Sequence, residues 1–437
     1  MDLSDRTALR EAIDRIRARA GLVLDAKTEQ AFFAGRMLTS VYYEKLGGPA
    51  PTEPALSRML LVAESHLHQP DVNSFYDIFR AARYVPLTRI LDRDLELLSV
   101  KATGWQSRFK RLVAAQEFDE LESILFELCV GARYSSLPYV QEVIFIHEGK
   151  APSPDLEVRL RFGSVFVECK KFDRMSDVTM QMRDGMRDAT RKAIRVFKAS
   201  GDSAIVEATL HCLPSEVDVR EFEAAVRSAF RSRGAIISPL WNVTAEPVKP
   251  LDLQHAYKLV PSPDYFWHQY RYATSGPWQG LVEAIRGDYA GPSFLDELYQ
   301  VIGIKWAVED HQIVSRQTRL GFQRLFRGIE QLADLGDRTI LHVCYDRTVS
   351  GPRAETLHRF LGEANKKKKE FSWVIFNELD IDVTLEGRYD FREHAHFAAG
   401  PKLFYSEPPV TQVFVTETLA AGGWELFGIG AELPPLD

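Results

Sequence analysis

Three strand-like runs follow one another in the middle of the chain, and they limit the possible folds more than any other feature. The runs occupy Tyr139–His147, Asp155–Phe162 and Ser164–Lys170. Only Gly163 and Ser164 are available to turn the chain between the last two runs, so we expect an antiparallel meander. A helical pattern at Glu117–Arg133 precedes the runs. Helix and strands together indicate a mixed α/β (α+β) unit.

The pattern of alternating elements continues after the third run. A long helix is expected at about 176–198, then a strand at 203–211 and a helix at 219–231. We therefore expect a core domain at 117–235. Three-to-four spacing of apolar residues predicts a helical N-terminal domain at 1–116.

The remaining region, 236–437, is expected to be an additional α/β region. Its first part, up to about residue 289, is rich in aromatic residues and looks loop-like. A helix at 316–332, a strand at 339–345, a helix at 354–366 and a strand at 371–377 follow. This second αβαβ stretch either extends the sheet of the core or forms a domain of its own, and the sequence does not decide between them.

Composition excludes several classes of protein. The 437 residues are 45% hydrophobic and 26% charged, which is typical of globular domains. No run of about 18 apolar residues predicts a membrane span, and the first residues do not resemble a signal peptide, so we expect a cytoplasmic protein. Four widely separated cysteines without a CxxC pair argue against a zinc site or a disulfide framework.

Charged residues at two strand ends carry the chemical signal. Pro154 and Asp155 open the second run, and Glu168, Cys169 and Lys170 close the third. Because side chains alternate along a strand, Glu168 and Lys170 should share one face and Cys169 should lie on the other. Charges at the end of an apolar strand need a partner or a metal ion, and Mg²⁺ prefers carboxylate oxygens.

These residues resemble the motif of the PD-(D/E)xK nuclease superfamily, which has the restriction-endonuclease-like fold. Pro154 and Asp155 match its first half, and Glu168, Cys169 and Lys170 match its second half. The resemblance covers about residues 117–215 and implies an αβββαβ core. That family often has a glutamate on the helix before the first strand. Glu127 is our first choice for this position and Glu122 the second.

The resemblance also implies a metal-dependent mechanism. Mg²⁺, for which Mn²⁺ can substitute, would be bound by Glu127, Asp155, Glu168 and the backbone carbonyl of Cys169. Asp155, Glu168 and Lys170 would form the catalytic set. Metal ions lower the pKa of bound water and neutralise charge on a phosphate, and the lysine would orient the water and balance the developing charge.

A basic helix follows the motif. Residues 170–200 contain nine Lys or Arg against four Asp, a balance of +5 in a chain with a net charge of −7. Such a surface fits a phosphate backbone, although arginines that pair with Asp184 and Asp188 on a solvated helix face would give the same pattern. The residues expected to contact nucleic acid are Lys171, Gln181, Arg183, Arg187, Arg191 and Arg195.

The sequence therefore predicts a Mg²⁺-dependent endonuclease, with DNA favoured over RNA. By analogy with other nucleases of this fold, a role in antiviral defence of bacteria or in a mobile element is expected. Cleavage of two strands would suit a homodimer, and the N-terminal or C-terminal region could bind a protein partner. One alternative is a catalytically silent nuclease-fold protein that binds nucleic acid or serves assembly. Another is a regulatory scaffold whose aromatic C-terminal half binds a protein or a small signal.

Overall fold

The protein is a mixed α/β protein with two compact units. The computed structural model describes residues 3–22, 53–68, 78–147, 153–172, 177–249, 280–289, 295–309, 323, 325–332, 335, 338–346, 371–383, 389–399 and 408–414. The first unit comprises Met1–Arg174, Gly321–Thr384 and Arg388–Asp437, and the second comprises Met175–Leu320 and Leu385–Gly387. Among the described residues, no helix combines the length and apolarity needed to cross a lipid bilayer.

The first unit is built on a seven-stranded sheet with the order β1-β2-β3-β4-β10-β11-β12. Its strands are β1 (Ala102–Thr103), β2 (Val140–Phe145), β3 (Leu156–Leu160), β4 (Gly163–Lys171), β10 (Thr339–Asp346), β11 (Trp373–Val383) and β12 (Tyr389–Ala399). The expected antiparallel meander is present as β2, β3 and β4. Strand β10 then pairs in parallel with both β4 and β11, and β12 returns antiparallel to β11.

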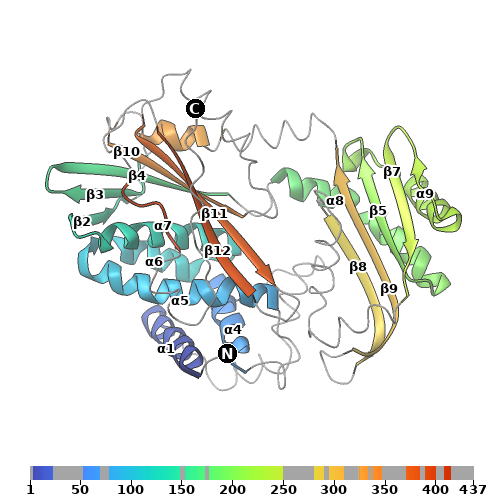
Figure 1. Ribbon diagram of the computed structural model, residues 1–437, viewed down its shortest axis with the longest axis horizontal. Helices are drawn as coiled ribbons and strands as arrows, with labels where there is room; N and C mark the ends of the chain where they lie inside the picture. Colours follow the sequence, from blue (N-terminus) through green and yellow to red (C-terminus); the bar gives the residue numbers. More distant parts are fainter. Residues whose placement is uncertain are drawn as a thin grey trace. The chain divides into compact units, whose positions relative to one another are not determined.

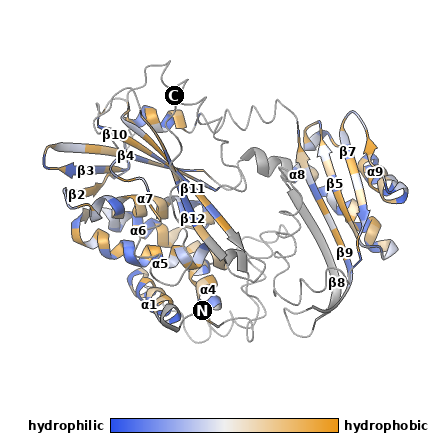
Figure 2. Ribbon diagram, in the orientation of Figure 1, coloured by the Kyte–Doolittle hydropathy of each residue, from blue (hydrophilic) through white to orange (hydrophobic). Residues whose placement is uncertain are grey.

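Helices cover both faces of this sheet. The labelled helices of the first unit are α1 (Leu3–Ala20), α4 (Ala55–His68), α5 (Ile78–Lys101), α6 (Trp105–Ala114) and α7 (Phe118–Ser136). Figure 1 shows α5 and α7 along one face. On the other face, the helical residues 325–332 pack through Leu325, Ile329 and Leu332 onto apolar side chains of β10 and β11. Both of these strands carry long apolar stretches (Figure 2), as burial between two helical layers requires.

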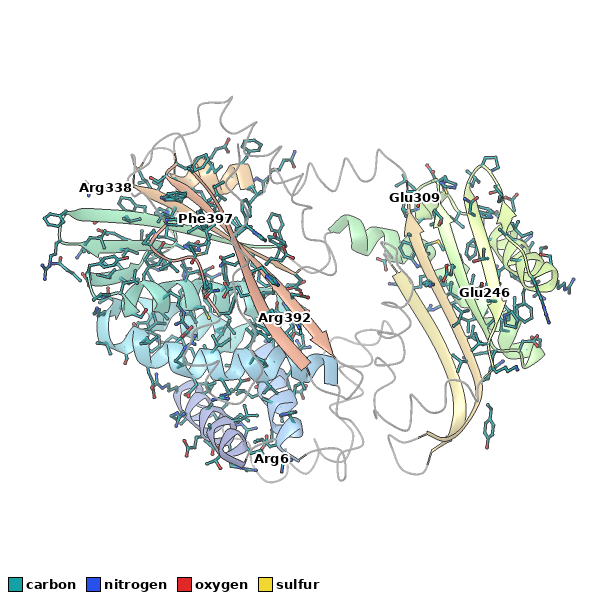
Figure 3. The ribbon with its side chains drawn as sticks, viewed as in Figure 1. Arg6, Glu246, Glu309, Arg338, Arg392 and Phe397 are labelled. Atoms are coloured by element: carbon teal, nitrogen blue, oxygen red, sulfur yellow. The ribbon has the colours of Figure 1, made fainter. Side chains whose placement is uncertain are left out.

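The turn between β3 and β4 depends on a glycine. Gly163 has a φ of +127°, and a Cβ at this position would lie 2.0 Å from Nη1 of Arg338. Arg338, labelled in Figure 3, donates a hydrogen bond from Nη1 to the carbonyl oxygen of Phe162. Any other residue at 163 would therefore adopt a strained backbone and displace this arginine. The turn fixes the register of the meander on which the candidate site depends.

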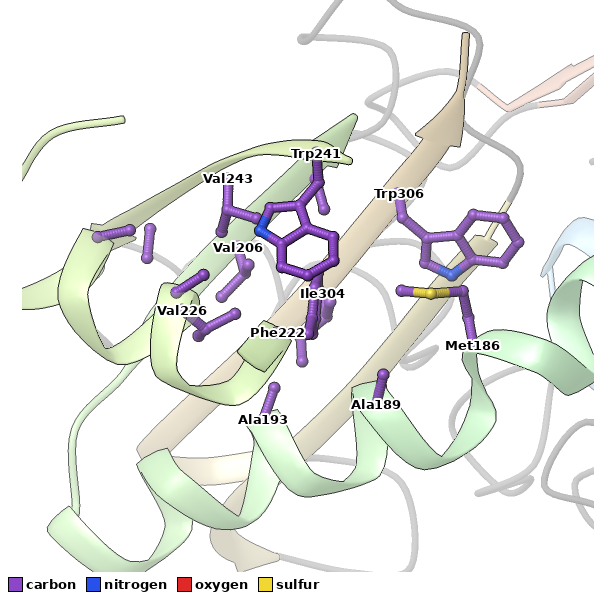
Figure 4. Close-up of a cluster of buried hydrophobic side chains, with 14 of the residues drawn as sticks. Met186, Ala189, Ala193, Val206, Phe222, Val226, Trp241, Val243, Ile304 and Trp306 are labelled. Atoms are coloured by element: carbon purple, nitrogen blue, oxygen red, sulfur yellow. The ribbon is translucent and has the colours of Figure 1, made fainter. Parts of the chain in front are cut away.

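The second unit has a five-stranded sheet with the order β6-β7-β5-β9-β8. Its elements are α8 (Asp177–Ser200), β5 (Ala204–Leu210), a short 3₁₀ helix (Pro214–Glu216), α9 (Val219–Ser232), β6 (Ile236–Ile237), β7 (Trp241–Pro247), β8 (Gly280–Tyr289) and β9 (Leu295–Val308). Helices α8 and α9 pack on one face of this sheet (Figure 4). In that core Phe222 meets Trp241 edge to face, and Met186 lies against Trp306.

The expected domain boundaries were wrong in two respects. The N-terminal helices belong to the same unit as the meander, because α5 and α7 cover its sheet. The strand at 204–210, expected in the core, lies in the second unit, and β10 takes the place beside β4. Of the two possibilities for the C-terminal region, the strand at 339–346 thus extends the sheet of the core. Both β5 and β10 are short, mostly apolar and largely buried, so pattern alone does not assign either to a sheet.

The region expected to be loop-like contains strands. In β7 the residues Trp241, Val243 and Ala245 are buried and alternate with more exposed polar residues, which is the period of a half-buried strand. Strand β8 also falls in this region, and β9 and β12 were not predicted. The expected helix at 354–366 lies outside the described residues.

A chain of buried polar groups crosses the first sheet. The hydroxyl of Tyr134 on α7 lies 3.1 Å from Nε2 of His342 on β10, and Nδ1 of His342 lies 3.5 Å from Oδ1 of Asn377 on β11. The amide nitrogen of Asn377 donates to Glu393 and to the carbonyl of Thr411. Oδ1 of Asn377 is therefore free to accept from Nδ1 of His342, which leaves Nε2 as the acceptor for the Tyr134 hydroxyl in the neutral ring. Burial lowers the pKa of His342 to about 4, against the opposing effect of the Asn377 contact.

Replacing His342 by glutamine should reduce the acid sensitivity of the fold. His342 takes up a proton near pH 6.5 when unfolded but only near pH 4 when folded, so its contribution to stability is complete above pH 6.5 and is lost as the pH falls. Between pH 7.5 and pH 5 this loss amounts to about 2 kcal/mol. Urea unfolding at both pH values measures it.

The quantity to compare between variant and wild type is the change in the free energy of unfolding from pH 7.5 to pH 5. Burial raises the pKa of Asp94 to about 7, which gives the opposite pH dependence in the same range, and burial of His66 adds a dependence of the same sign. Neither effect is altered by the substitution. An identical loss of stability in the His342→Gln variant and the wild type would contradict the prediction.

Candidate active site

Pairing of β3 with β4 brings the two halves of the motif together. Leu156 pairs with Val167, so the preceding Asp155 lies beside Glu168. The backbone nitrogen of Cys169 donates to Oδ2 of Asp155 at 2.8 Å, and the backbone nitrogen of Ile146 donates to the Asp155 carbonyl at 2.9 Å. Asp155 is thus held beside the end of β4 by one backbone donor to its carboxylate and one to its carbonyl.

Glu168 and Lys170 form an ion pair on one face of β4. Nζ of Lys170 contacts Oε1 of Glu168, and the two side chains are 30% and 1% exposed. The stem of Lys170 lies close to the helix at 325–332, because a Cβ on Gly328 would be 3.4 Å from Cγ of Lys170. The thiol of Cys169 is buried, which raises its pKa and keeps it protonated. The lysine therefore presents a charged head at the edge of a buried carboxylate.

The electrostatics of Glu168 are those of a crowded, buried acid. Burial raises its pKa to about 8, and the Asp155 carboxylate adds to this effect, whereas Lys170 opposes it. For Lys170, burial favours the neutral form, but the Glu168 charge outweighs burial and raises the pKa. Oε2 of Glu168 is buried and has no hydrogen-bond partner among the residues that the structure describes. A cation next to this oxygen would lower the pKa of Glu168 and satisfy the oxygen.

Glu127 reaches the site through an arginine. Nε of Arg108, on α6, lies 3.0 Å from Oε2 of Glu127, and Nη2 of the same arginine lies 3.5 Å from Oδ1 of Asp155. The structure therefore brings together the residues expected in the site: Glu127, Asp155, Glu168, Cys169 and Lys170. Within the described ranges, no group of three or more His, Cys, Asp or Glu side chains has the spacing of a metal site.

Lys171, expected to contact nucleic acid, has a different position. Its Nζ lies 2.8 Å from Oε2 of Glu122, and both side chains are 2% exposed. Arg83 on α5 donates to Glu122 from Nε at 2.7 Å and to Asp346 from Nη1 at 3.0 Å. These four residues are called the buried ion cluster below. Because Lys171 follows Lys170 in a strand, it points to the opposite face of the sheet, where Glu122 of α7 and Arg83 of α5 enclose it and a phosphate cannot reach it. Glu122, the second choice for the helix glutamate, belongs to this cluster.

The predicted basic ridge lies on α8 of the second unit. Arg187, Arg191 and Arg195 are exposed on this helix, and Arg187 pairs with Asp184. This ion pair is one of the two contacts expected if the helix face is simply solvated. The side chains of Gln181 and Arg183 lie outside the described residues. The candidate site, by contrast, is formed entirely by residues of the first unit.

Comparisons with known proteins add no functional assignment. Family models, curated proteins and solved structures give no match to this chain. The site therefore has to be interpreted from its own geometry.

Sequence reasoning missed Arg108. The arginine lies in an amphipathic stretch, Trp105–Ala114, that gives no local indication of a buried guanidinium. It is nevertheless 4% exposed and contacts two of the expected metal ligands. Only the packing of α6 beside α7 and β2 places it there, so a pattern within one helix could not have identified it.

Proposed function

We propose that this protein is a metal-dependent nuclease that hydrolyses phosphodiester bonds, with DNA as the favoured substrate. The observation that carries the proposal is the placement of Asp155 beside Glu168, with Lys170 on the same face of β4. Two carboxylates and an amine at one strand end are the groups that metal-assisted phosphodiester hydrolysis requires. This arrangement agrees with the PD-(D/E)xK motif that the sequence resembles.

The order of elements supports the same proposal. Helix α7 is followed by β2, β3 and β4, and the helix at 325–332 is followed by β10, which pairs in parallel with β4. Taken together, these elements follow the αβββαβ order of a restriction-endonuclease-like core, and the second unit stands in the chain between β4 and the second helix.

The adjacent carboxylates of Asp155 and Glu168 suit a hard divalent cation such as Mg²⁺, which usually takes one or two carboxylates and completes its shell with water and substrate. They would hold it with the Cys169 backbone carbonyl, and Oε2 of Glu168, which has no hydrogen-bond partner among the described residues, is a suitable donor. Glu127, which lies across Arg108 from Asp155, would join them only when the arginine gives way. When bound, the metal supplies Lewis acidity toward water and phosphate. Lys170 then orients the attacking water from the edge of the site, and its charge offsets the negative charge that develops on the phosphate.

The test is incubation of the purified full chain with supercoiled plasmid, linear duplex, single-stranded DNA and RNA, in Mg²⁺, Mn²⁺ or EDTA. Asp155→Asn is the active-site variant. Glu157→Gln is the matched control, because Glu157 lies two residues later on β3 and pairs with Arg159 and Ser164. We expect metal-dependent cleavage by the wild type and by Glu157→Gln, and its loss in Asp155→Asn.

A second candidate function is a binding module without turnover. The observation in its favour is that Arg108 already pairs with Glu127 and Asp155, two of the carboxylates that a metal ion would need. Binding of nucleic acid without cleavage under any of the metal conditions would favour this module. A chain that neither cleaves nor binds nucleic acid would overturn both proposals.

A further inference from the structure

We propose that Arg108 is a resident counter-ion of the candidate site, which competes with a divalent cation for Glu127 and Asp155 and so sets the metal affinity. The inference rests on the proposed function, because it assumes that these carboxylates bind a metal ion. It adds a residue that the motif does not contain.

The contacts of Arg108 place its charge between two expected ligands. Its side chain is 5% exposed, and the Glu127 and Asp155 side chains are each 13% exposed. Nη2 also donates to the carbonyl oxygen of Ile146 at 3.2 Å. A guanidinium so deeply buried needs these partners, since burial of an unpaired charge is unfavourable.

A divalent cation that displaced the Arg108 guanidinium would balance the charges of the site. A bound divalent cation would keep Glu168 ionised, so Glu127, Asp155 and Glu168 would then give three negative charges, and Arg108 and Lys170 two positive charges. A divalent cation in place of the guanidinium would make these groups neutral, whereas one added beside it would leave an excess positive charge. Unfavourable Coulomb interactions at such short distances favour the neutral arrangement.

The buried ion cluster provides the contrast of a purely structural arginine. There Arg83 and Lys171 face Glu122 and Asp346, so the charges are already equal. Glu122 and Asp346 are 2% and 8% exposed, less than the carboxylates that Arg108 contacts. Around Arg108, by contrast, one guanidinium faces two carboxylates, each of which is 13% exposed.

The test is the affinity for Mn²⁺, measured by titration calorimetry on the full chain. Arg108→Met removes the charge and keeps the length of the side chain. We expect it to bind Mn²⁺ about tenfold more tightly than the wild type and to show a larger rise in melting temperature on Mn²⁺ addition. Arg108→Lys keeps the charge with a shorter reach and should lie between them, which provides a second variant if Arg108→Met does not fold. Arg111→Met, at an exposed arginine on the same helix, is the control.

The outcomes separate this inference from the proposed function. If the wild type binds Mn²⁺ and cleaves nucleic acid, but the Arg108 variants bind Mn²⁺ no more tightly, only the inference is overturned. If the Arg108 variants bind Mn²⁺ more tightly and the wild type cleaves nothing, the inference holds and the nuclease proposal falls. If neither the wild type nor the variants bind Mn²⁺, both are overturned.

Discussion

Replacement of Lys170 by methionine should lower the rate of metal-dependent cleavage by about 10²–10³-fold. The lysine side chain is 30% exposed, against 5% for Arg108, so it can meet a water molecule or a phosphate without leaving Glu168. Methionine retains the stem that packs beside Gly328 but not the charge. Single-turnover cleavage assays with excess enzyme measure the effect on the chemical step.

The same variant should remain folded. Glu168 already has a pKa of about 8, so it takes up a proton easily when its lysine partner is lost. Lys110→Met, at an exposed lysine on α6, controls for the loss of one positive charge. Unchanged cleavage by Lys170→Met would remove the lysine from the mechanism, whereas loss of the folded state would show that its role is structural.

Replacement of Lys171 by methionine should destabilise the fold, unlike replacement of Lys170. The free energy of unfolding is expected to fall by about 3–5 kcal/mol, because Glu122 and Asp346 would then share the single positive charge of Arg83 inside the protein. Burial favours the neutral form of Lys171, but the Glu122 charge outweighs burial and raises the pKa, as expected for a stabilised ion pair. Urea unfolding followed by circular dichroism measures the loss.

A second substitution tests the cause. Glu122→Gln combined with Lys171→Met leaves Arg83 and Asp346 as one balanced pair, so the double variant should be more stable than Lys171→Met alone. Stability equal to that of the wild type in Lys171→Met, together with weaker binding of DNA, would instead support the original expectation that this lysine contacts nucleic acid.

The two lysines show what the sequence could predict and what it could not. Alternation along the strand correctly placed Glu168 and Lys170 on one face, and the apolar neighbours correctly indicated a buried strand. The environment of Lys171 could not be predicted, because its partners come from elements that are distant in the sequence. Arg83, for example, contacts a carboxylate 263 positions later in the chain.

A similar limit applies to the fold. The meander and helices α7, α8 and α9 follow from local patterns, and their positions were predicted to within a few residues. Which buried strand pairs with β4 is a question of long-range contacts. Strands 204–210 and 339–346 are equally apolar, and only the packing of the helix at 325–332 against β10 decides in favour of the second.

The position of the second unit in the chain affects how the protein can fold during synthesis. Strand β4 leaves the ribosome well before β10, because nearly all of the second unit is translated between them. The second unit can complete its sheet while β4 still has an open edge, and an open edge favours pairing with other chains. The carboxylates of the candidate site are therefore present early on an incomplete sheet, and the nascent chain has to keep that edge from aggregating until its last strands arrive.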